Sequence, residues 1–196
     1  MLKVWTRPRA GSWRRVAGPF PARIGYSGWV AAQVRVQSTG TTPAGTFTLR
    51  RAFGALADPG TTLPYIRFDD TDYWPYEPRD PATYNVYQYS KSPRTHWRPG
   101  YTEHLIDFLP DYDYAAVIGF NLPRHISYSA SRGQRVAGDP ADTRRGGGIF
   151  LHVRDGGPTA GCVAIAERHM RWVLSWLRAE RRPRIVMGPW GFVHSQ

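Results

Sequence analysis

The clearest structural pattern in the sequence lies at residues 149–165, which read Ile149-Phe150-Leu151-His152-Val153-Arg154-Asp155-Gly156-Gly157-Pro158-Thr159-Ala160-Gly161-Cys162-Val163-Ala164-Ile165. Its first five residues are apolar except for one histidine, which is typical of a buried β-strand. A Gly-Gly-Pro turn then brings the chain back toward that strand. We therefore predict a hairpin with a short loop, in which His152 comes close to Cys162.

The pair formed by His152 and Cys162 indicates nucleophilic chemistry. A cysteine attacks as its thiolate, and a neighbouring imidazole stabilises that anion as imidazolium. Gly161 would let backbone N–H groups approach a substrate carbonyl closely, as in an oxyanion hole. Arg154 and Arg168 would lower the pKa of the thiol further. The residues alone leave one alternative open, a small, buried and unreactive cysteine.

Short strands separated by turns are predicted for most of the chain. The 20 glycines and 17 prolines are typical of a turn-rich protein. Apolar or alternating runs predict strands at residues 2–5, 31–36, 46–49, 114–120, 148–153 and 184–188. Met170, Val173, Leu174 and Leu177 have helical spacing, and residues 102–109 also fit a short helix. We predict a single mainly β domain, a β-sandwich or mixed sheet, with one or two helices that include this C-terminal amphipathic helix.

Two regions lack a clear period. Residues 122–146 are predicted to form a polar loop. Residues 54–100 are rich in Pro, Asp and Tyr, and we interpret them as a long ordered excursion whose rings pack on the core; a platform for sugars or peptides is the alternative. Trp172 and Trp176 on the terminal helix are expected to be buried against the sheet. No internal repeat and no change in composition marks a second domain.

The net charge is strongly positive, and it comes almost entirely from arginine. The 26 basic and 15 acidic residues give +11, and only Lys3 and Lys91 are lysines. A catalytic lysine is therefore disfavoured, whereas polyanionic neighbours are favoured. Because the arginines are scattered, we expect a generally basic surface and no nucleic-acid partner. No apolar run is long enough to form a transmembrane segment, and residues 1–16 lack the apolar core of a signal peptide.

The sequence gives little support for a metal or a cofactor. Its single cysteine excludes an intramolecular disulfide and a cysteine-rich zinc site. Glu103 and His104 are adjacent and would diverge on a helix, and His96 adds no ligand spacing. The acidic residues at 69–77 lack the glycine and the final glutamate of a calcium loop, so we interpret them as a solvated loop. We predict no metal and no cofactor.

Three separated motifs resemble the L,D-transpeptidase catalytic-domain family (YkuD-like). The first is His152 followed by the Ser/Thr-x-Gly-Cys-aliphatic signature at residues 159–163. The second is the Thr-Pro-x-Gly-x-Phe stretch within residues 41–47, and the third comprises Phe53-Gly54 and Gly119-Phe120-Asn121. The resemblance implies an N-terminal strand or extension at 1–24, a catalytic domain at 25–188 and a C-terminal tail at 189–196.

What the resemblance implies is acyl transfer on peptidoglycan stem peptides. Cys162 would form a thioester with the stem, His152 would act as base and acid, and an amine from a neighbouring stem would resolve the thioester. Gly161 and Cys162 would supply the oxyanion-hole amides. The candidate substrate-binding residues are Thr159, Ala160, Asn121 and Arg154. Carbapenems are expected to acylate the cysteine, the location is expected to be extracytoplasmic, at the cell envelope, and a monomer is expected.

The sequence departs from the family pattern at two positions. Ala160 stands where the pattern has a histidine before the glycine, and Ala164 stands where an arginine or asparagine is common. The hold on the stem peptide is therefore the least supported part of this interpretation. His152 and Cys162 are also closer in sequence than in many relatives, which is why we expect a short hairpin loop.

Two alternative functions remain open from the sequence. With water as the acceptor, the same thioester chemistry would make an L,D-peptidase or carboxypeptidase. A binding module of a different class would use the arginines to hold acidic polymers and would leave Cys162 inert.

Overall fold

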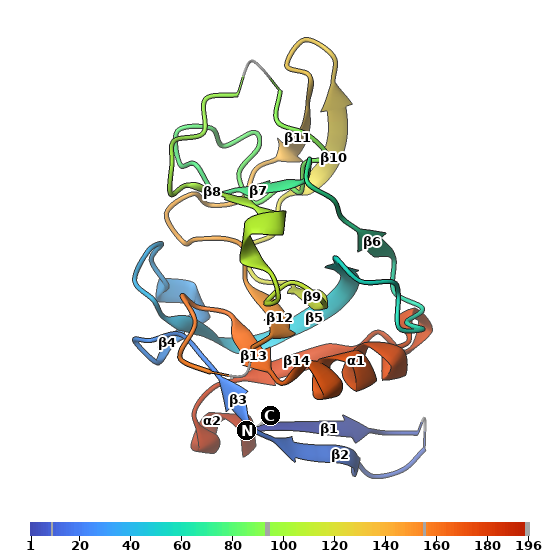
Figure 1. Cartoon of the computed structure of the whole chain (residues 1–196). Coiled ribbons are helices and arrows are strands. Elements are labelled where there is room, and N and C mark those ends of the chain that lie inside the picture. The colour runs from blue at the N-terminus through green and yellow to red at the C-terminus, as the bar shows by residue number, and fades with distance from the viewer. Residues whose placement is uncertain (9, 93–94, 155, 195–196) are drawn as a thin grey trace.

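A mixed sheet of eight strands organises residues 1–8, 10–92, 95–154 and 156–194, which this computed structural model describes (Figure 1). Six strands follow in the order β14, β5, β9, β12, β13 and β3, while β4 and β6 also pair with β5. Their bounds are β3 Ala22–Arg23, β4 Trp29–Ala31, β5 Thr42–Gly54, β6 Tyr65–Arg67, β9 Ala115–Ile118, β12 Phe150–Val153, β13 Val163–Ile165 and β14 Arg184–Met187. The predicted mainly β fold is confirmed. Asp155 and residues 195–196, which the predicted turn and tail include, lie outside the described residues.

One face of the sheet packs against helix α1 (Glu167–Trp176), as Figure 1 shows. Met170, Val173 and Leu174 form its buried stripe and join a largely aliphatic cluster with the sheet. The predicted amphipathic helix is therefore confirmed. The predicted burial of Trp172 is wrong, because this residue lies beside the stripe and remains 38% exposed. Its ring meets the edge of Phe20 and stacks on Trp176.

The opposite face is covered by a region that we call the cap, residues 68–112 and 121–139 (Figure 1). Its elements are β7 Tyr73–Pro75, β8 Thr102–His104, the 3-10 helix η2 Leu105–Phe108, β10 Arg124–Ser129 and β11 Gln134–Asp139. Aromatic rings join the cap to the sheet. Phe150 of β12 lies 4.7 Å from Trp74 and 5.7 Å from Tyr112, measured between ring centroids. The rings of the cap thus continue the core.

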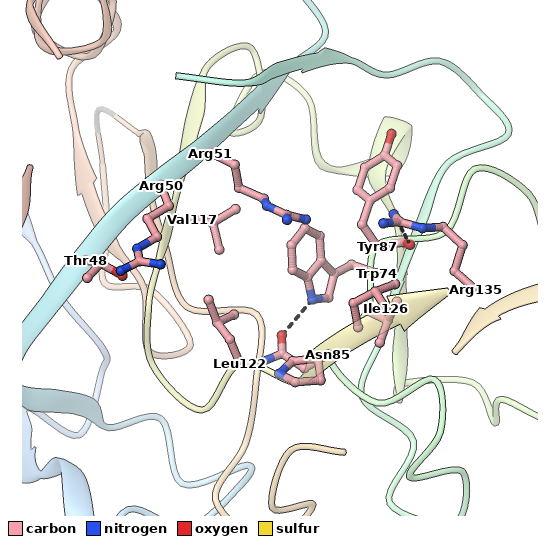
Figure 2. Close-up of a pocket in the computed structure, with 12 residues that line it drawn as sticks. Thr48, Arg50, Arg51, Trp74, Asn85, Tyr87, Val117, Leu122, Ile126 and Arg135 are labelled. Atoms are coloured by element: carbon pink, nitrogen blue, oxygen red, sulfur yellow. Dashed lines mark hydrogen bonds between the residues drawn. The ribbon is translucent and has the colours of Figure 1, made fainter. Parts of the chain in front are cut away.

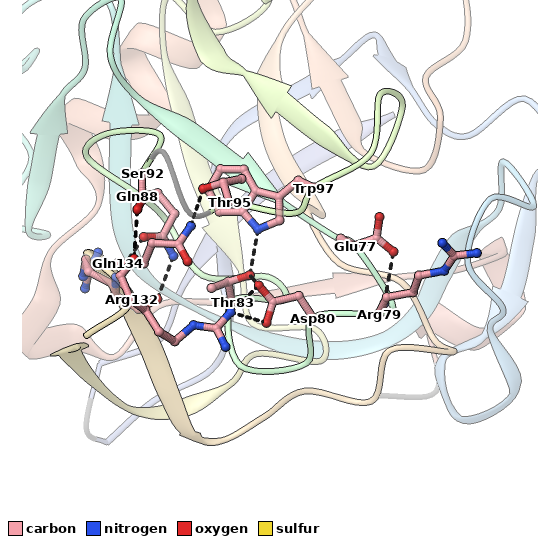
Figure 3. A network of polar contacts seen from close by, with 11 residues as sticks. Glu77, Arg79, Asp80, Thr83, Gln88, Ser92, Thr95, Trp97, Arg132 and Gln134 are labelled. Atoms are coloured by element: carbon pink, nitrogen blue, oxygen red, sulfur yellow. Dashed lines mark hydrogen bonds and ion pairs between the residues drawn. The ribbon is translucent and has the colours of Figure 1, made fainter. Parts of the chain in front are cut away.

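Buried polar contacts hold the cap together (Figure 3). Arg132 donates to both carboxylate oxygens of Asp80 at 2.7 Å, and Asp80 also accepts a bond from the Thr83 hydroxyl. Glu77 is 1% exposed at its side chain and pairs with Arg98 at 2.7 Å. The predicted ordered excursion is confirmed for its described residues, which leave out 93–94. The solvated acidic loop is wrong at Glu77, whose buried charge an arginine neutralises, and at Asp72, which is 5% exposed and accepts the Asp69 N–H.

Three predicted elements differ from the structure. Residues 102–109 form β8 and η2 instead of a helix, because Glu103 pairs with Trp74 across the β7–β8 ladder. Of the strand predicted at 31–36, only Ala31 is in a strand, as the last residue of β4, and the 3-10 helix η1 (Ala32–Val34) follows it. The polar loop predicted at 122–146 contains the antiparallel pair β10–β11. At residues 102–109 a ladder with a strand distant in sequence overrides the local pattern, whereas β10 and β11 form a local hairpin.

The chain termini add smaller elements around the sheet. Strands β1 (Leu2–Thr6) and β2 (Arg14–Phe20) form a two-stranded ribbon, and β3 then joins the central sheet through β13. The C-terminal part contains the 3-10 helix η3 (Ala179–Arg181), β14 and the short helix α2 (Trp190–His194). The domain limits at residues 24 and 188 stay a prediction. Among the described residues, no helix has the length and apolar character to cross a membrane.

Candidate active site

Neighbouring strands of the central sheet carry both predicted catalytic side chains. Strands β12 and β13 are parallel, with His152 opposite Ala164 and Leu151 opposite Val163. If this register is extended by one residue toward the N-terminus of both strands, Phe150 lies beside Cys162, which directly precedes β13. Phe150 and His152 are two residues apart on one strand, so both face the cap, as does the Cys162 side chain. The structure therefore brings His152 and Cys162 to the same face.

The predicted hairpin is wrong, because the two strands run in the same direction. The connection between β12 and β13, in which Asp155 lies outside the described residues, is a short crossover between parallel neighbours instead of a turn between antiparallel ones. Two backbone bonds anchor the crossover at Thr159, whose N–H donates to Ile24 O and whose carbonyl accepts from the Tyr26 N–H, each at 2.9 Å. The N-terminal segment next to β3 thus fixes the loop that precedes Cys162.

The thiol of Cys162 is held by the backbone of the strand beside it. Its Sγ accepts a bond from the Phe150 N–H at 3.3 Å and donates one to the Gly148 carbonyl at 3.2 Å. Burial, together with the nearby carboxyl of Glu103, raises the pKa of this thiol to about 12. The Phe150 N–H and the charge of Arg35 favour the thiolate, but they are the weaker influences. At neutral pH the resting Cys162 is therefore a thiol.

His152 is fixed in one orientation and is neutral. Its Nδ1 lies 2.9 Å from the carbonyl oxygen of Val153, and since a carbonyl only accepts, Nδ1 carries the proton. The unprotonated Nε2 is then free to accept a proton. Burial lowers the pKa of this imidazole. The expected thiolate–imidazolium pair is thus disfavoured at rest, and no bond between thiol and ring is found among the described contacts.

The loop before the cysteine is braced from within. Thr159 Oγ1 donates to the Cys162 carbonyl at 2.7 Å and accepts the Gly161 N–H at 3.1 Å. Gly161 has φ +149°, and an added Cβ would lie 2.9 Å from the Arg35 guanidinium and 3.0 Å from the Thr41 carbonyl. Only glycine fits this close approach. Its N–H is engaged by Thr159, while the side chain of Ala160 is exposed.

Arg35 is a site residue that sequence reasoning missed. It is 5% exposed, and its guanidinium donates to the carbonyls of Thr41 at 2.9 Å and Arg145 at 2.7 Å. Its positive charge lowers the pKa of the Cys162 thiol, a role that the sequence suggested for Arg154 and Arg168. The only hint in the sequence is an arginine within the alternating run at 31–36. In a strand with that alternation, the arginine would lie on the polar, exposed side.

Glu103 and two tyrosines of the cap also lie close to the thiol. The Tyr112 hydroxyl donates to Glu103 Oε2 at 2.6 Å, and the Tyr112 ring meets the edge of His152 at 5.5 Å. Burial raises the pKa of Glu103 to about 7, although hydrogen bonds from Tyr112 and Tyr76 oppose that rise. Gly148, whose carbonyl accepts the hydrogen bond from the thiol, lies against the ring of Tyr76. Tyr76, Glu103 and Tyr112 all belong to the cap, and none of them was assigned to the site from the sequence.

Comparison with known proteins gives one match. A family model described as YkuD, the L,D-transpeptidase catalytic domain, matches residues 15–186. The chain belongs to the L,D-transpeptidase family. No curated protein and no solved structure matches it significantly. The resemblance recognised in the motifs is therefore confirmed at the level of the family.

The remaining candidates in this L,D-transpeptidase domain lie apart from the thiol. The side chain of Asn121 donates to the carbonyls of Asp142 and Gly146 and accepts the Asp142 N–H, so it braces the loop before β12. Arg154 pairs with Asp111 at 2.7 Å, donates to Pro158 O, and lines a pocket with Arg168. Neither residue makes a hydrogen bond or an ion pair with Cys162 in the described part of the chain. Among the described residues, no group of His, Cys, Asp and Glu could hold a metal ion.

Proposed function

We propose that the protein is a cysteine acyltransferase of peptidoglycan stem peptides, acting through a thioester on Cys162 with His152 as base and acid. The observation that carries this proposal is the placement of both side chains on one face of neighbouring parallel strands. The fixed orientation of His152, with Nδ1 bonded to Val153 O and Nε2 unprotonated, supports its role as a base.

The chemistry starts from a neutral pair. As Sγ attacks the carbonyl carbon of the stem, the thiol gives up its hydrogen bond to the Gly148 carbonyl and transfers its proton to Nε2 of His152. The imidazolium then protonates the departing amine of the terminal D-amino acid, and the thioester remains. An amine of a second stem attacks this thioester, returns a proton through His152 and restores the thiol. With water in its place, the same steps give hydrolysis.

We assign the stabilisation of the developing oxyanion chiefly to the Cys162 N–H. The Gly161 N–H is bonded to Thr159, which supports a bracing role for this threonine. The exposed Ala160, together with Asn121 and Arg154, stays a candidate for substrate contact. An extracytoplasmic location and a monomeric state belong to the same proposal, and the family supports the former.

The test is the intact mass of the protein after incubation with a carbapenem. We expect one adduct on the wild type and none on Cys162→Ala, which should fold normally because only one sulfur atom is removed from a partly exposed residue. No adduct on the wild type, or the same adduct on Cys162→Ala, would contradict the proposal. Slow alkylation by iodoacetamide would not, because a thiol with a pKa of about 12 carries little thiolate at neutral pH.

A second readout separates the transferase from a hydrolase and from a binding module. Stem tetrapeptide is incubated with and without an amine acceptor, and the products are identified by mass. A cross-linked product that needs Cys162 supports transfer, whereas tripeptide alone supports hydrolysis. Binding of acidic polymers without either product, unchanged in Cys162→Ala, would favour the module.

A further inference from the structure

A bulge in β5 turns two consecutive arginines toward the cap. Between Leu49 and Ala52 the strand has one residue more than its partner β9 has between Ile118 and Ala116. In a regular strand, Arg50 and Arg51 would point to opposite faces, whereas a bulge redirects one of them. Both arginines line one pocket together with Val117 of β9.

This arginine pocket has a volume of about 120 Å³ and is lined by Arg50, Arg51, Trp74, Val117, Leu122 and Arg135 among others (Figure 2). Its base is apolar, since Trp74 and Val117 belong to the aromatic cluster under the cap. Arg135 of β11 is held in place by a bond to the Tyr87 carbonyl at 3.0 Å. Three guanidinium groups thus surround a small apolar hollow.

The positive charge in the pocket is not neutralised within the described residues. Arg50 and Arg51 have no ion pair and no side-chain hydrogen bond there. Partial burial and the repulsion from Arg135 lower the pKa of Arg51. Gathering like charges beside apolar groups opposes folding, and an anion bound between them would relieve that repulsion.

The shape and chemistry of the pocket select the kind of anion. Guanidinium groups recognise planar carboxylates through paired hydrogen bonds. Pockets for whole drug-sized ligands measure roughly 300–1,000 Å³. A pocket of about 120 Å³ therefore accepts one end of a molecule, with a carboxylate at the arginines and a short apolar segment over Trp74 and Leu122.

The pocket and the thiol are connected by a continuous row of residues across the sheet. Arg50 and Arg51 lie opposite Val117, Val117 pairs with Phe150, and the Phe150 N–H bonds to the Cys162 Sγ. This row crosses three strand spacings, or about 14 Å. Val117 and Phe150 are buried under the cap, so a ligand that reaches both the pocket and the thiol has to follow the surface of the protein, over more than this straight-line distance.

We propose that the arginine pocket binds a carboxylate of the peptide substrate, three strand spacings, or about 14 Å in a straight line, from the Cys162 thiol. This inference rests on the proposed function and adds a second point of attachment to it. It also offers a substitute for the basic side chain that the family pattern often has where this chain has Ala164.

The test measures binding by calorimetry in the Cys162→Ala background, which prevents turnover. The probes are a stem tetrapeptide with free carboxylates, its fully amidated analogue, and acetate. The variants are Arg51→Gln and, as a matched control for the loss of one charge, Arg14→Gln on the exposed start of β2. Thermal melting of Arg51→Gln checks its fold, which should be kept because no bonded partner is lost.

We expect the free tetrapeptide to bind at least about tenfold more tightly than the amidated one, as suits a charge-assisted bond. Arg51→Gln should abolish this preference, and Arg14→Gln should keep it. An equal affinity for the two peptides, a preference that survives Arg51→Gln, or acetate that binds as tightly as the peptide would overturn the proposal. Failure of the carbapenem adduct with the preference intact would instead contradict the proposed acyl transfer, so the two failures are distinguishable.

Discussion

The two faces of the central sheet are stabilised in different ways. On the face of α1, an aliphatic cluster including Leu151, Ile165 and Leu174 excludes water. On the face of the cap, aromatic rings alternate with buried charged and polar groups, among them Glu77, Asp80 and Gln88. The proposed catalytic pair, His152 and Cys162, faces the second of these. The side of the sheet to which we assign the chemistry is therefore the one whose stability depends on ionisation.

This difference follows from what each face must do. Aliphatic packing needs only matched volume and a periodic pattern, and it does not respond to pH. A site for nucleophilic chemistry needs carboxyls, hydroxyls and guanidinium groups, and each of them has to be paired once it is buried. The predictions below test this contrast.

The largest effect on stability is expected on the aliphatic face. Leu174 is fully buried in α1, so Leu174→Ala leaves a cavity and should lower the free energy of unfolding by about 3 kcal/mol. The measurement is urea unfolding at two pH values, and the loss should be the same at both. A loss that changes with pH would contradict the contrast between the faces.

A smaller effect is expected when one buried charge of the cap is removed. Glu77→Gln gives up the charge that pairs with Arg98 and should cost about 1–2 kcal/mol at pH 7. That pairing lowers the pKa of Glu77 from 4.5 to about 2, so its stabilisation is present above pH 4.5 and is lost as the pH falls toward 2. Unfolding midpoints of wild type and variant should therefore converge in acid. Parallel curves down to pH 2 would refute this assignment.

The smallest effect on stability is expected at Glu103. Its contribution decreases as the pH rises, whereas that of Glu77 decreases as the pH falls. Burial raises its pKa from 4.5 to about 7, so the folded state holds this proton more tightly than the unfolded chain does. The stabilisation by the protonated carboxyl is complete below pH 4.5 and is lost as the pH rises through 7. In Glu103→Gln, which keeps a neutral side chain at all pH values, thermal melting should lose this slope between pH 4.5 and 7. An unchanged slope would mean that another group titrates there.

The sequence specified those parts of the fold that depend on local pattern. The apolar run at β12, the helical spacing of Met170, Val173 and Leu174, and the strand β14 were predicted from their own residues. So was the pair His152 and Cys162, because a short loop joins their strands. The parallel direction of β13 was not, since both directions give the same apolar pattern.

The parts that the sequence did not specify depend on partners far along the chain. Arg35 bonds to the carbonyl of Arg145, and Glu103 takes its place through the pairing of β8 with β7. Arg50 and Arg51 reach one pocket only because β5 bulges opposite β9. No periodic pattern or motif in the sequence predicts these contacts, although they determine the surroundings of Cys162 and of the arginine pocket.

The bonding of the Cys162 thiol has a consequence for oxidation. Peroxides react with the thiolate, and a cysteine that carries little of it at rest is oxidised slowly to the sulfenic acid. With its pKa raised to about 12 and its S–H donating a hydrogen bond to the Gly148 carbonyl, Cys162 is poorly suited to that reaction. Cys162, which has no second cysteine in this sequence to reduce it again, is thus expected to remain reduced at rest.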